Sequence, residues 1–130
     1  MASPAALNAL LDAGTPLVVT AQSGRPPPEW LHNIWEIGFD TPYSFDSLDA
    51  MSCELNRGSS DHDLFLVNHW LSTAIGLPDR DAAATTNSAA VLGARALECE
   101  ERWGRRANLI AVDWFATGDL FAVVDTLNGF

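Results

Sequence analysis

The segment Leu64-Phe65-Leu66-Val67-Asn68-His69-Trp70 indicates the fold class, because it is apolar for four residues and then turns polar. A short apolar run of this kind is typical of a strand buried inside a sheet. Two further runs share the pattern, Leu17–Thr20 before Gln22 and Leu109–Val112 before Asp113. The runs alternate with segments of helical composition, so we expect an α/β fold with parallel strands and flanking helices.

The predicted helices separate these strands along the chain. We expect helices over four segments, Ala5–Ala13, Glu29–Glu36, Ala82–Trp103 and Leu120–Leu127. The third has the strongest helical composition, and Gly104 follows it as a residue that commonly ends a helix. Gly38–Arg57 lacks a helical or strand pattern and is predicted to be irregular.

Composition bounds the class of protein. The 130 residues suit a single domain and carry 17 acidic side chains against 7 basic ones, all arginine, for a net charge of -10. This balance disfavours nucleic-acid binding and electrostatic attachment to anionic membranes, because both need a basic patch. We predict no transmembrane segment, since no apolar run approaches the roughly 18–20 residues that span a bilayer. Met1–Asn8 has no basic side chain, so no signal peptide is expected in this chain.

The polar residues that follow the apolar strands are the candidate site. In parallel α/β folds the carboxyl ends of the strands form the ligand-binding edge of the sheet, and Asn68, His69 and Asp113 fall there. Trp70 and Trp114 directly follow these polar ends and are placed to wall a pocket. The alternative is that the polar residues are satisfied internally and only cap the strands.

Other clusters carry less chemistry. Asp61-His62-Asp63 could ligate a metal by residue type, but adjacent ligands before a strand favour a solvated turn, and we predict no metal and no cofactor. A serine hydrolase built on Ser23 is disfavoured because the chain has no Gly-x-Ser-x-Gly elbow. Cys53 and Cys99 fit either a disulfide or two buried thiols.

Five segments together resemble a known family. The chain is similar, from about Leu17 to its end, to the C-terminal half of the phosphatidylinositol-specific phospholipase C-like phosphodiesterases, most of all to their bacterial and fungal secreted branch. The segments that carry the resemblance are Phe39-Asp40-Thr41-Pro42-Tyr43-Ser44-Phe45, Cys53-Glu54-Leu55-Asn56-Arg57-Gly58, Phe65-Leu66-Val67-Asn68-His69-Trp70-Leu71, Cys99–Gly104 and Asn108–Phe115.

The resemblance implies a fold and a set of roles. The family folds as a (β/α)₈ barrel of about 250 residues, so this chain is expected to form a half barrel over residues 1–130. Its activity is phosphodiester hydrolysis by two histidines, with an aspartate that orients one of them, and Asp113 resembles that aspartate. Asn68, His69 and Trp70 fall where the family lines its substrate pocket. The family's cysteine pair matches Cys53 and Cys99, which implies a disulfide and an extracellular or periplasmic location.

One departure from the family limits these expectations. The N-terminal half of its pattern, with both catalytic histidines and a phosphate-binding arginine, has no counterpart here, because His32, His62 and His69 do not lie in its motifs. We therefore expect a phosphoric diester hydrolase that is incomplete or inactive as this chain alone. The alternative is a non-catalytic binding or assembly module. The expected partners are a phosphodiester or phospholipid head group, and a missing barrel half or a second copy of the chain, because a half barrel exposes unpaired strand edges.

Overall fold

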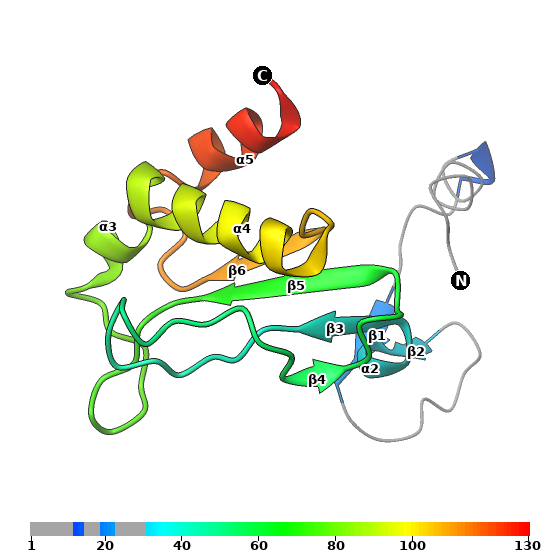
Figure 1. The fold of residues 1–130 in the computed structure, drawn as a ribbon, viewed down its shortest axis with the longest axis horizontal. Coiled ribbons are helices and arrows are strands. Elements are labelled where there is room, and N and C mark those ends of the chain that lie inside the picture. Colours follow the sequence, from blue (N-terminus) through cyan, green and yellow to red (C-terminus); the bar gives the residue numbers. More distant parts are fainter. Residues whose placement is uncertain (1–11, 15–18, 23–30) are drawn as a thin grey trace.

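The computed structural model describes residues 12–14, 19–22 and 31–130, which form a mixed α/β structure (Figure 1). Its larger sheet has the strand order β4-β3-β5-β6. These strands are β3 (Gly38–Asp40), β4 (Arg57–Gly58), β5 (Leu64–His69) and β6 (Leu109–Val112). β3, β5 and β6 run parallel, whereas β4 pairs antiparallel with β3. Over the described residues the sheet stays open and does not close into a barrel.

A second, smaller sheet precedes the larger one. It pairs β1 (Val19–Ala21) with β2 (Leu31–Asn33) in parallel. The short helix α2 (Ile34–Ile37) follows β2 at once, and the Asn33 side chain caps it by accepting a hydrogen bond from the Trp35 backbone at 3.0 Å.

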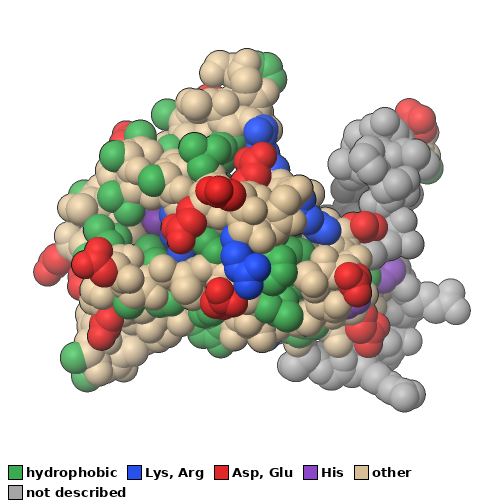
Figure 2. Space-filling model, in the orientation of Figure 1, with side chains coloured by type: hydrophobic (Ala, Val, Ile, Leu, Met, Phe, Trp, Pro, Cys, Tyr) green, Lys and Arg blue, Asp and Glu red, His purple; other side chains and the backbone are tan. Residues whose placement is uncertain are grey.

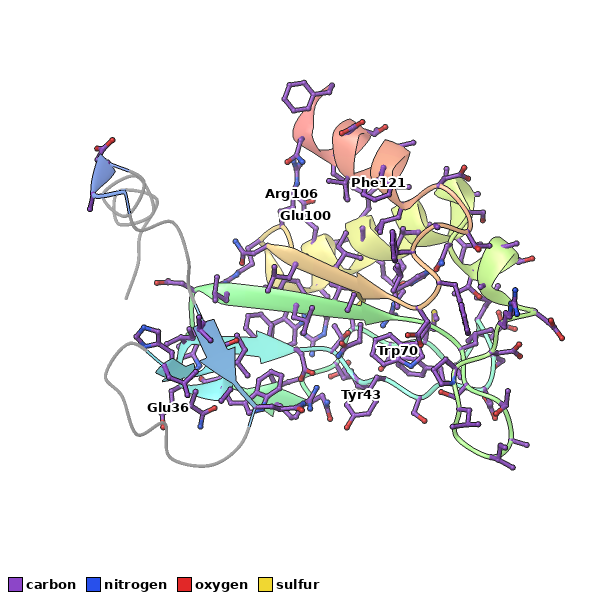
Figure 3. The ribbon with its side chains drawn as sticks, turned by 180° about the vertical axis from the view of Figure 1, so that it is seen from behind. Glu36, Tyr43, Trp70, Glu100, Arg106 and Phe121 are labelled. Atoms are coloured by element: carbon purple, nitrogen blue, oxygen red, sulfur yellow. A yellow bond between two sulfur atoms is a disulfide. The ribbon has the colours of Figure 1, made fainter. Side chains whose placement is uncertain are left out.

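The remaining helices lie on one side of the larger sheet. They are α3 (Ala83–Thr86), α4 (Ala89–Trp103) and α5 (Leu120–Asn128). α4 packs on β5, and both α3 and α5 pack against α4. In Figure 1 α4 lies in front of β5 and β6, and in the reverse view of Figure 3 these strands lie in front of α4. α4 ends at Gly104, whose φ of 64° is the left-handed conformation that glycine adopts without steric cost.

The core lies between this sheet face and α4. Phe39 and Phe65 stack with ring centroids 4.5 Å apart, and Trp103 meets Phe39 edge-on at 5.2 Å. The disulfide between Cys53 and Cys99 closes the same cluster. The pairing implied by the family resemblance is therefore present, and it ties the segment before β4 to α4.

Alternation of side chains along β5 divides its residues between two faces. Phe65, Val67 and His69 are fully buried beneath the helices. Leu64 and Leu66 belong to the opposite face and are only half-buried. Leu109, which pairs with Leu66 in β6, is 46% exposed on that second face. The helix-covered face is thus fully packed, whereas on the second face Asp40 and Asn68 are buried and the part formed by Leu64, Leu66 and Leu109 is only partly covered.

Several predicted elements are confirmed. The apolar runs Leu64–Val67 and Leu109–Val112 form β5 and β6, and Leu120–Leu127 lies within α5. The predicted strand Leu17–Thr20 overlaps β1, although residues 15–18 lie outside the described residues. Most of the predicted helix Ala5–Ala13 also lies outside them.

Two predictions between residues 29 and 57 are confirmed only in part. The predicted helix Glu29–Glu36 is confirmed over Ile34–Glu36, which belong to α2, whereas Leu31–Asn33 is strand β2, because these residues pair with β1. Gly38–Arg57, predicted to be irregular, contains β3 and the start of β4. β3 is only three residues long and obtains its hydrogen bonds from β4 and β5, so a local pattern does not reveal it.

The predicted helix Ala82–Trp103 is divided into α3 and α4. The break falls at Asn87 and Ser88, where Ser88 has extended backbone with ψ of 152°. Asn87 directs its side-chain amide away from the helix and donates to the backbone carbonyls of Asp113 at 2.9 Å and Thr117 at 3.1 Å. These tertiary hydrogen bonds compete with a continuous helix.

Candidate functional site

A narrow cleft, which has no room for a water molecule as it stands, lies where β5 and β6 end and α3 begins. It brings together Trp70, Asp113 and Trp114, three of the residues that the sequence analysis selected. The cleft is lined by Trp70, Leu71, Asp79, Ala83, Thr86, Asn87, Asp113 and Trp114. Because it sits at the carboxyl ends of parallel strands, it occupies the position where α/β folds commonly bind ligands.

Two aspartates line this cleft, Asp79 and Asp113. The Asp79 carboxylate accepts hydrogen bonds from backbone amides, whereas that of Asp113 has no partner among the described residues. The backbone carbonyl of Asp113 is fixed by Asn87, but among the described residues its carboxylate makes no hydrogen bond or ion pair. Partial burial raises the pKa of Asp113, because removing water disfavours the charged form. Asp113 is therefore a carboxylate on a fixed backbone, with its oxygens available to another group.

Trp114 follows Asp113 in a backbone conformation that is uncommon for a large residue. Its φ is 56°, in the left-handed region, and its side chain is 45% exposed. The guanidinium of Arg80 lies 5.5 Å from the centre of the indole, within the range of a cation–π contact. Uncommon backbone conformations of this kind occur often at ligand sites. In this conformation Trp114 lines the cleft.

Asn68 does not reach the cleft, although it is one of the predicted residues. It is buried, and its side-chain amide donates to Asp40 Oδ2 at 2.9 Å and to the Thr41 carbonyl at 2.6 Å. Its backbone N–H donates to Thr41 Oγ1 at 3.0 Å. Asn68 therefore holds the ends of β3 and β5 together.

His69 lies on the helix-covered face and is fully buried. Its Nε2 is 2.7 Å from the Thr86 carbonyl, whereas its Nδ1 has no partner within the described structure. Desolvation lowers the pKa of His69, the Thr86 carbonyl opposes this, and the charge of Arg95 adds to the lowering. A neutral imidazole that donates from Nε2 fits these contacts, and the structure does not bring His69 to the surface of the cleft.

A second polar cluster, which the sequence pattern did not reveal, lies at the end of β3. Asp40 is fully buried and accepts hydrogen bonds from Asn56 at 3.3 Å, Asn68 at 2.9 Å and the Arg57 backbone at 2.9 Å. The Arg57 guanidinium also binds Asp40 through Nε, at 3.0 Å, and through Nη2. Every contact satisfies the buried carboxylate, as buried charges require.

Aromatic rings connect this cluster to the cleft. The Arg57 guanidinium lies 4.1 Å from the centre of the Trp35 ring and 4.8 Å from that of Tyr43. Tyr43 in turn stacks on Trp70 with centroids 5.9 Å apart, as Figure 3 shows. The sequence did contain a signal for this cluster. In Gly38-Phe39-Asp40 a polar residue follows a very short apolar segment, as polar residues follow the longer apolar runs of β5 and β6.

The described part of the chain contains no recognisable metal-binding site. No group of three or more His, Cys, Asp and Glu side chains is arranged there to hold an ion. Within Asp61-His62-Asp63, the two aspartates are exposed and His62 Nδ1 is 3.1 Å from the Gly38 carbonyl. The described helices are also too short or too polar to cross a membrane.

Comparisons with known proteins agree on one family. A family model described as PI-PLC X 1 matches residues 2–128. A curated protein of Arthroderma benhamiae, PI-PLC X domain-containing protein 1, is 31% identical over 134 aligned residues. The match covers 95% of this chain and 44% of that relative, so the chain spans less than half the relative's length. No solved structure is significantly similar to the chain.

Proposed function

The chain belongs to the PI-PLC X family, and on this premise we propose that it is the C-terminal half of a phospholipase C-like phosphoric diester hydrolase. The observation that carries the proposal is the Asp113 carboxylate, which lies in the cleft without a hydrogen-bond partner among the described residues. A carboxylate in this position suits the role of orienting a histidine that arrives from another segment.

The chemistry follows from what an aspartate does for an imidazole. By accepting a hydrogen bond from one ring nitrogen, Asp113 would fix the tautomer that leaves the other nitrogen free to take a proton. It would then stabilise the imidazolium that forms as the attacking hydroxyl loses its proton to the ring. We assign Asp113 this orienting role and Trp70 and Trp114 the walls of the pocket that holds the phosphodiester or phospholipid head group.

Asn68 and His69 take supporting positions in this proposal. Asn68 binds Asp40, which in turn holds Arg57 between the rings of Trp35 and Tyr43. His69 anchors α3 through the Thr86 carbonyl. Both residues therefore act on the pocket through its walls and have no direct contact with the substrate.

A half barrel also accounts for the part of the second sheet face that is only partly covered. Leu109 is 46% exposed on this face, and β6 is the last strand of the described sheet. We propose that the other half of the barrel, or a second copy of this chain, continues the sheet at β6 and covers Leu64, Leu66 and Leu109. The Cys53–Cys99 disulfide is compatible with a protein that works in an oxidising, extracytoplasmic compartment.

Reconstitution tests the proposal. The chain is mixed or co-expressed with the part of the Arthroderma benhamiae relative that lies outside its match. Hydrolysis is then followed on phosphatidylinositol vesicles and on a soluble phosphodiester. We expect no turnover by either part alone and turnover by the mixture, with size-exclusion chromatography reporting whether the two parts form a complex.

The remaining outcomes decide against the proposal. Turnover by this chain alone would show that it carries its own catalytic histidine. A stable complex that binds a phosphodiester without hydrolysing it would favour the non-catalytic binding or assembly module.

A further inference from the structure

The buried side chain of Asn87 holds both ends of the loop that follows β6. Asn87 lies at the break between α3 and α4 and is 1% exposed. Both hydrogens of its amide nitrogen are used on this loop, because Nδ2 donates to the Asp113 carbonyl at 2.9 Å and to the Thr117 carbonyl at 3.1 Å. In Figure 1 the chain that leaves β6 passes behind this break before α5 begins. One amide group therefore fixes the loop at its first residue and again close to its end.

The backbone of Asn87 holds the last residues of the same loop. Its carbonyl accepts a hydrogen bond from the Asp119 amide at 2.8 Å. Gly118 packs directly on Asn87, since a Cβ at Gly118 would lie 2.6 Å from the Asn87 carbonyl oxygen. The φ of Gly118 is 92°, a conformation that residues with a side chain rarely adopt. Asp119 completes the junction, because its Oδ2 accepts from the Ala89 amide at 2.8 Å and so caps the first turn of α4.

The surroundings of this junction favour its hydrogen bonds. Residues 82–94 include no charged side chain, and the surface over α3 and the start of α4, at the upper left of Figure 2, is mostly hydrophobic and uncharged. Charged groups do not compete there, and water has little access to the buried Asn87. A hydrogen bond lost from Asn87 therefore leaves a loop carbonyl without a partner, which is unfavourable. The junction thus holds the loop in one arrangement.

We infer that Asn87 is a positioning residue for the Asp113 carboxylate. The aspartate side chain is short, so the place of its oxygens follows closely from the place of its backbone. A carboxylate that orients a histidine must lie within hydrogen-bond reach of a ring nitrogen, and a misplacement of about 1 Å costs on the order of 10²-fold in rate. The inference rests on the proposed function, because that proposal gives Asp113 its orienting role. It adds a residue from another element, whose amide acts on the reaction through Asp113.

The Asp113 carboxyl group can report its own position in the intact chain. Partial burial raises the pKa of Asp113, so a carboxylate released into water should titrate at lower pH. Carboxyl NMR spectroscopy of the isotopically labelled chain measures this midpoint. Asn87→Ser has one donor where the amide has two, and Gly118→Ala pushes the loop away from Asn87. Each substitution should lower the Asp113 midpoint, and Gly118→Ala decides alone if Asn87→Ser does not fold.

Gly104→Ala is the matched control for backbone strain. The φ of Gly104 is also positive, at 64°, but nothing lies within 4 Å of the added Cβ, so the Asp113 midpoint should stay unchanged. The other charged groups of the cleft and the loop are the same in all three variants, namely Asp79, Arg80 and Asp119. Urea unfolding shows which variants are folded under the conditions of the titration. An Asp113 midpoint that neither Asn87→Ser nor Gly118→Ala changes overturns the inference.

A double-mutant cycle in the reconstituted protein tests whether Asn87 acts through Asp113. Asn87→Ser alone should lower kcat/KM for phosphodiester hydrolysis about tenfold or more. In the Asp113→Asn background the same change should have little further effect, because the carboxylate that Asn87 positions is already gone. The acid limb of the pH profile should also move to lower pH in Asn87→Ser, because a displaced carboxylate no longer stabilises the imidazolium.

The outcomes separate this inference from the function on which it rests. Fully additive effects of the two substitutions, or a loss of activity with an unmoved acid limb, would leave Asn87 a merely structural role and overturn the inference while hydrolysis stands. Lower Asp113 midpoints in Asn87→Ser and Gly118→Ala, without turnover by the reconstituted protein, would reject the proposed hydrolysis and support the positioning of Asp113 by Asn87.

Discussion

Two aspartates stand at the ends of parallel strands, and their surroundings differ. Asp40, at the end of β3, is fully buried and is bound by Asn56, Arg57 and Asn68. Asp113, directly after β6, lies in the cleft, and its carboxylate has no hydrogen bond within the described residues.

The difference separates a structural carboxylate from one that is available for chemistry. A buried charge with satisfied partners has no oxygen left for a ligand, and its loss leaves Arg57 without its counterion. A carboxylate without partners contributes little to stability and can accept a hydrogen bond from an incoming group. The same residue type at equivalent strand ends therefore has two different surroundings, and the predictions below test the two roles proposed for them.

The largest expected change in stability comes from Asp40→Asn. Removing the negative charge leaves the half-buried Arg57 guanidinium unpaired and should lower the free energy of unfolding by about 3 kcal/mol or more. Urea unfolding measures this change. Asp49→Asn on an exposed turn is the matched control and should stay within about 0.5 kcal/mol. A loss no larger than that of the control would remove the structural role assigned to Asp40.

Reduction of the disulfide is expected to have the next largest effect. Cys53 and Cys99 are 46 residues apart, and opening a loop of this length costs about 2–4 kcal/mol of stability in the chain-entropy view. The segment that Cys53 anchors leads to Arg57, so the Arg57 amide, which donates to Asp40, should lose protection from hydrogen exchange.

The Asp119 amide provides the internal reference for that measurement. It donates to the Asn87 carbonyl at 2.8 Å, on the Asp113 side of the molecule and away from the disulfide. Its protection should fall less than that of the Arg57 amide. Equal loss at both amides would show that the disulfide stabilises the two regions alike, and a Cys53→Ala/Cys99→Ala variant should not respond to reductant.

His69 makes stability depend on pH by a smaller amount. Its folded pKa lies below the unfolded value of 6.5, so the unfolded chain binds more protons and stability falls as pH decreases below about 6.5. The slope contributed by His69 is at most about 1.4 kcal/mol per pH unit. Urea midpoints measured from about pH 5 to about pH 8, the range in which a histidine changes its charge, should show this fall in stability. If His69→Gln keeps the same fall in stability and His62→Gln shows none, the pH dependence comes from His62, and the prediction for His69 is contradicted.

The sequence indicated β5 and β6 because their apolar runs are local features, whereas β3 depends on partners far along the chain. Asp40 was missed for the same reason, since its partners Arg57 and Asn68 lie 17 and 28 residues away. The face of His69 was available from the sequence, because His69 alternates in phase with the buried Phe65 and Val67. Trp70, Asp113 and Trp114 were found because they directly follow strand ends.

The central claim is that Asp113 serves catalysis and contributes little to folding, and Asp113→Asn in the reconstituted protein tests it most directly. We expect kcat/KM for phosphodiester hydrolysis to fall on the order of 10²-fold or more, because the amide cannot hold the histidine tautomer or stabilise the imidazolium. The free energy of unfolding should change by no more than about 0.5 kcal/mol, and since burial raises the pKa of Asp113, any change at neutral pH should be a gain. A reconstituted Asp113→Asn protein that keeps its full kcat/KM, or loses activity only because it unfolds, would contradict the account.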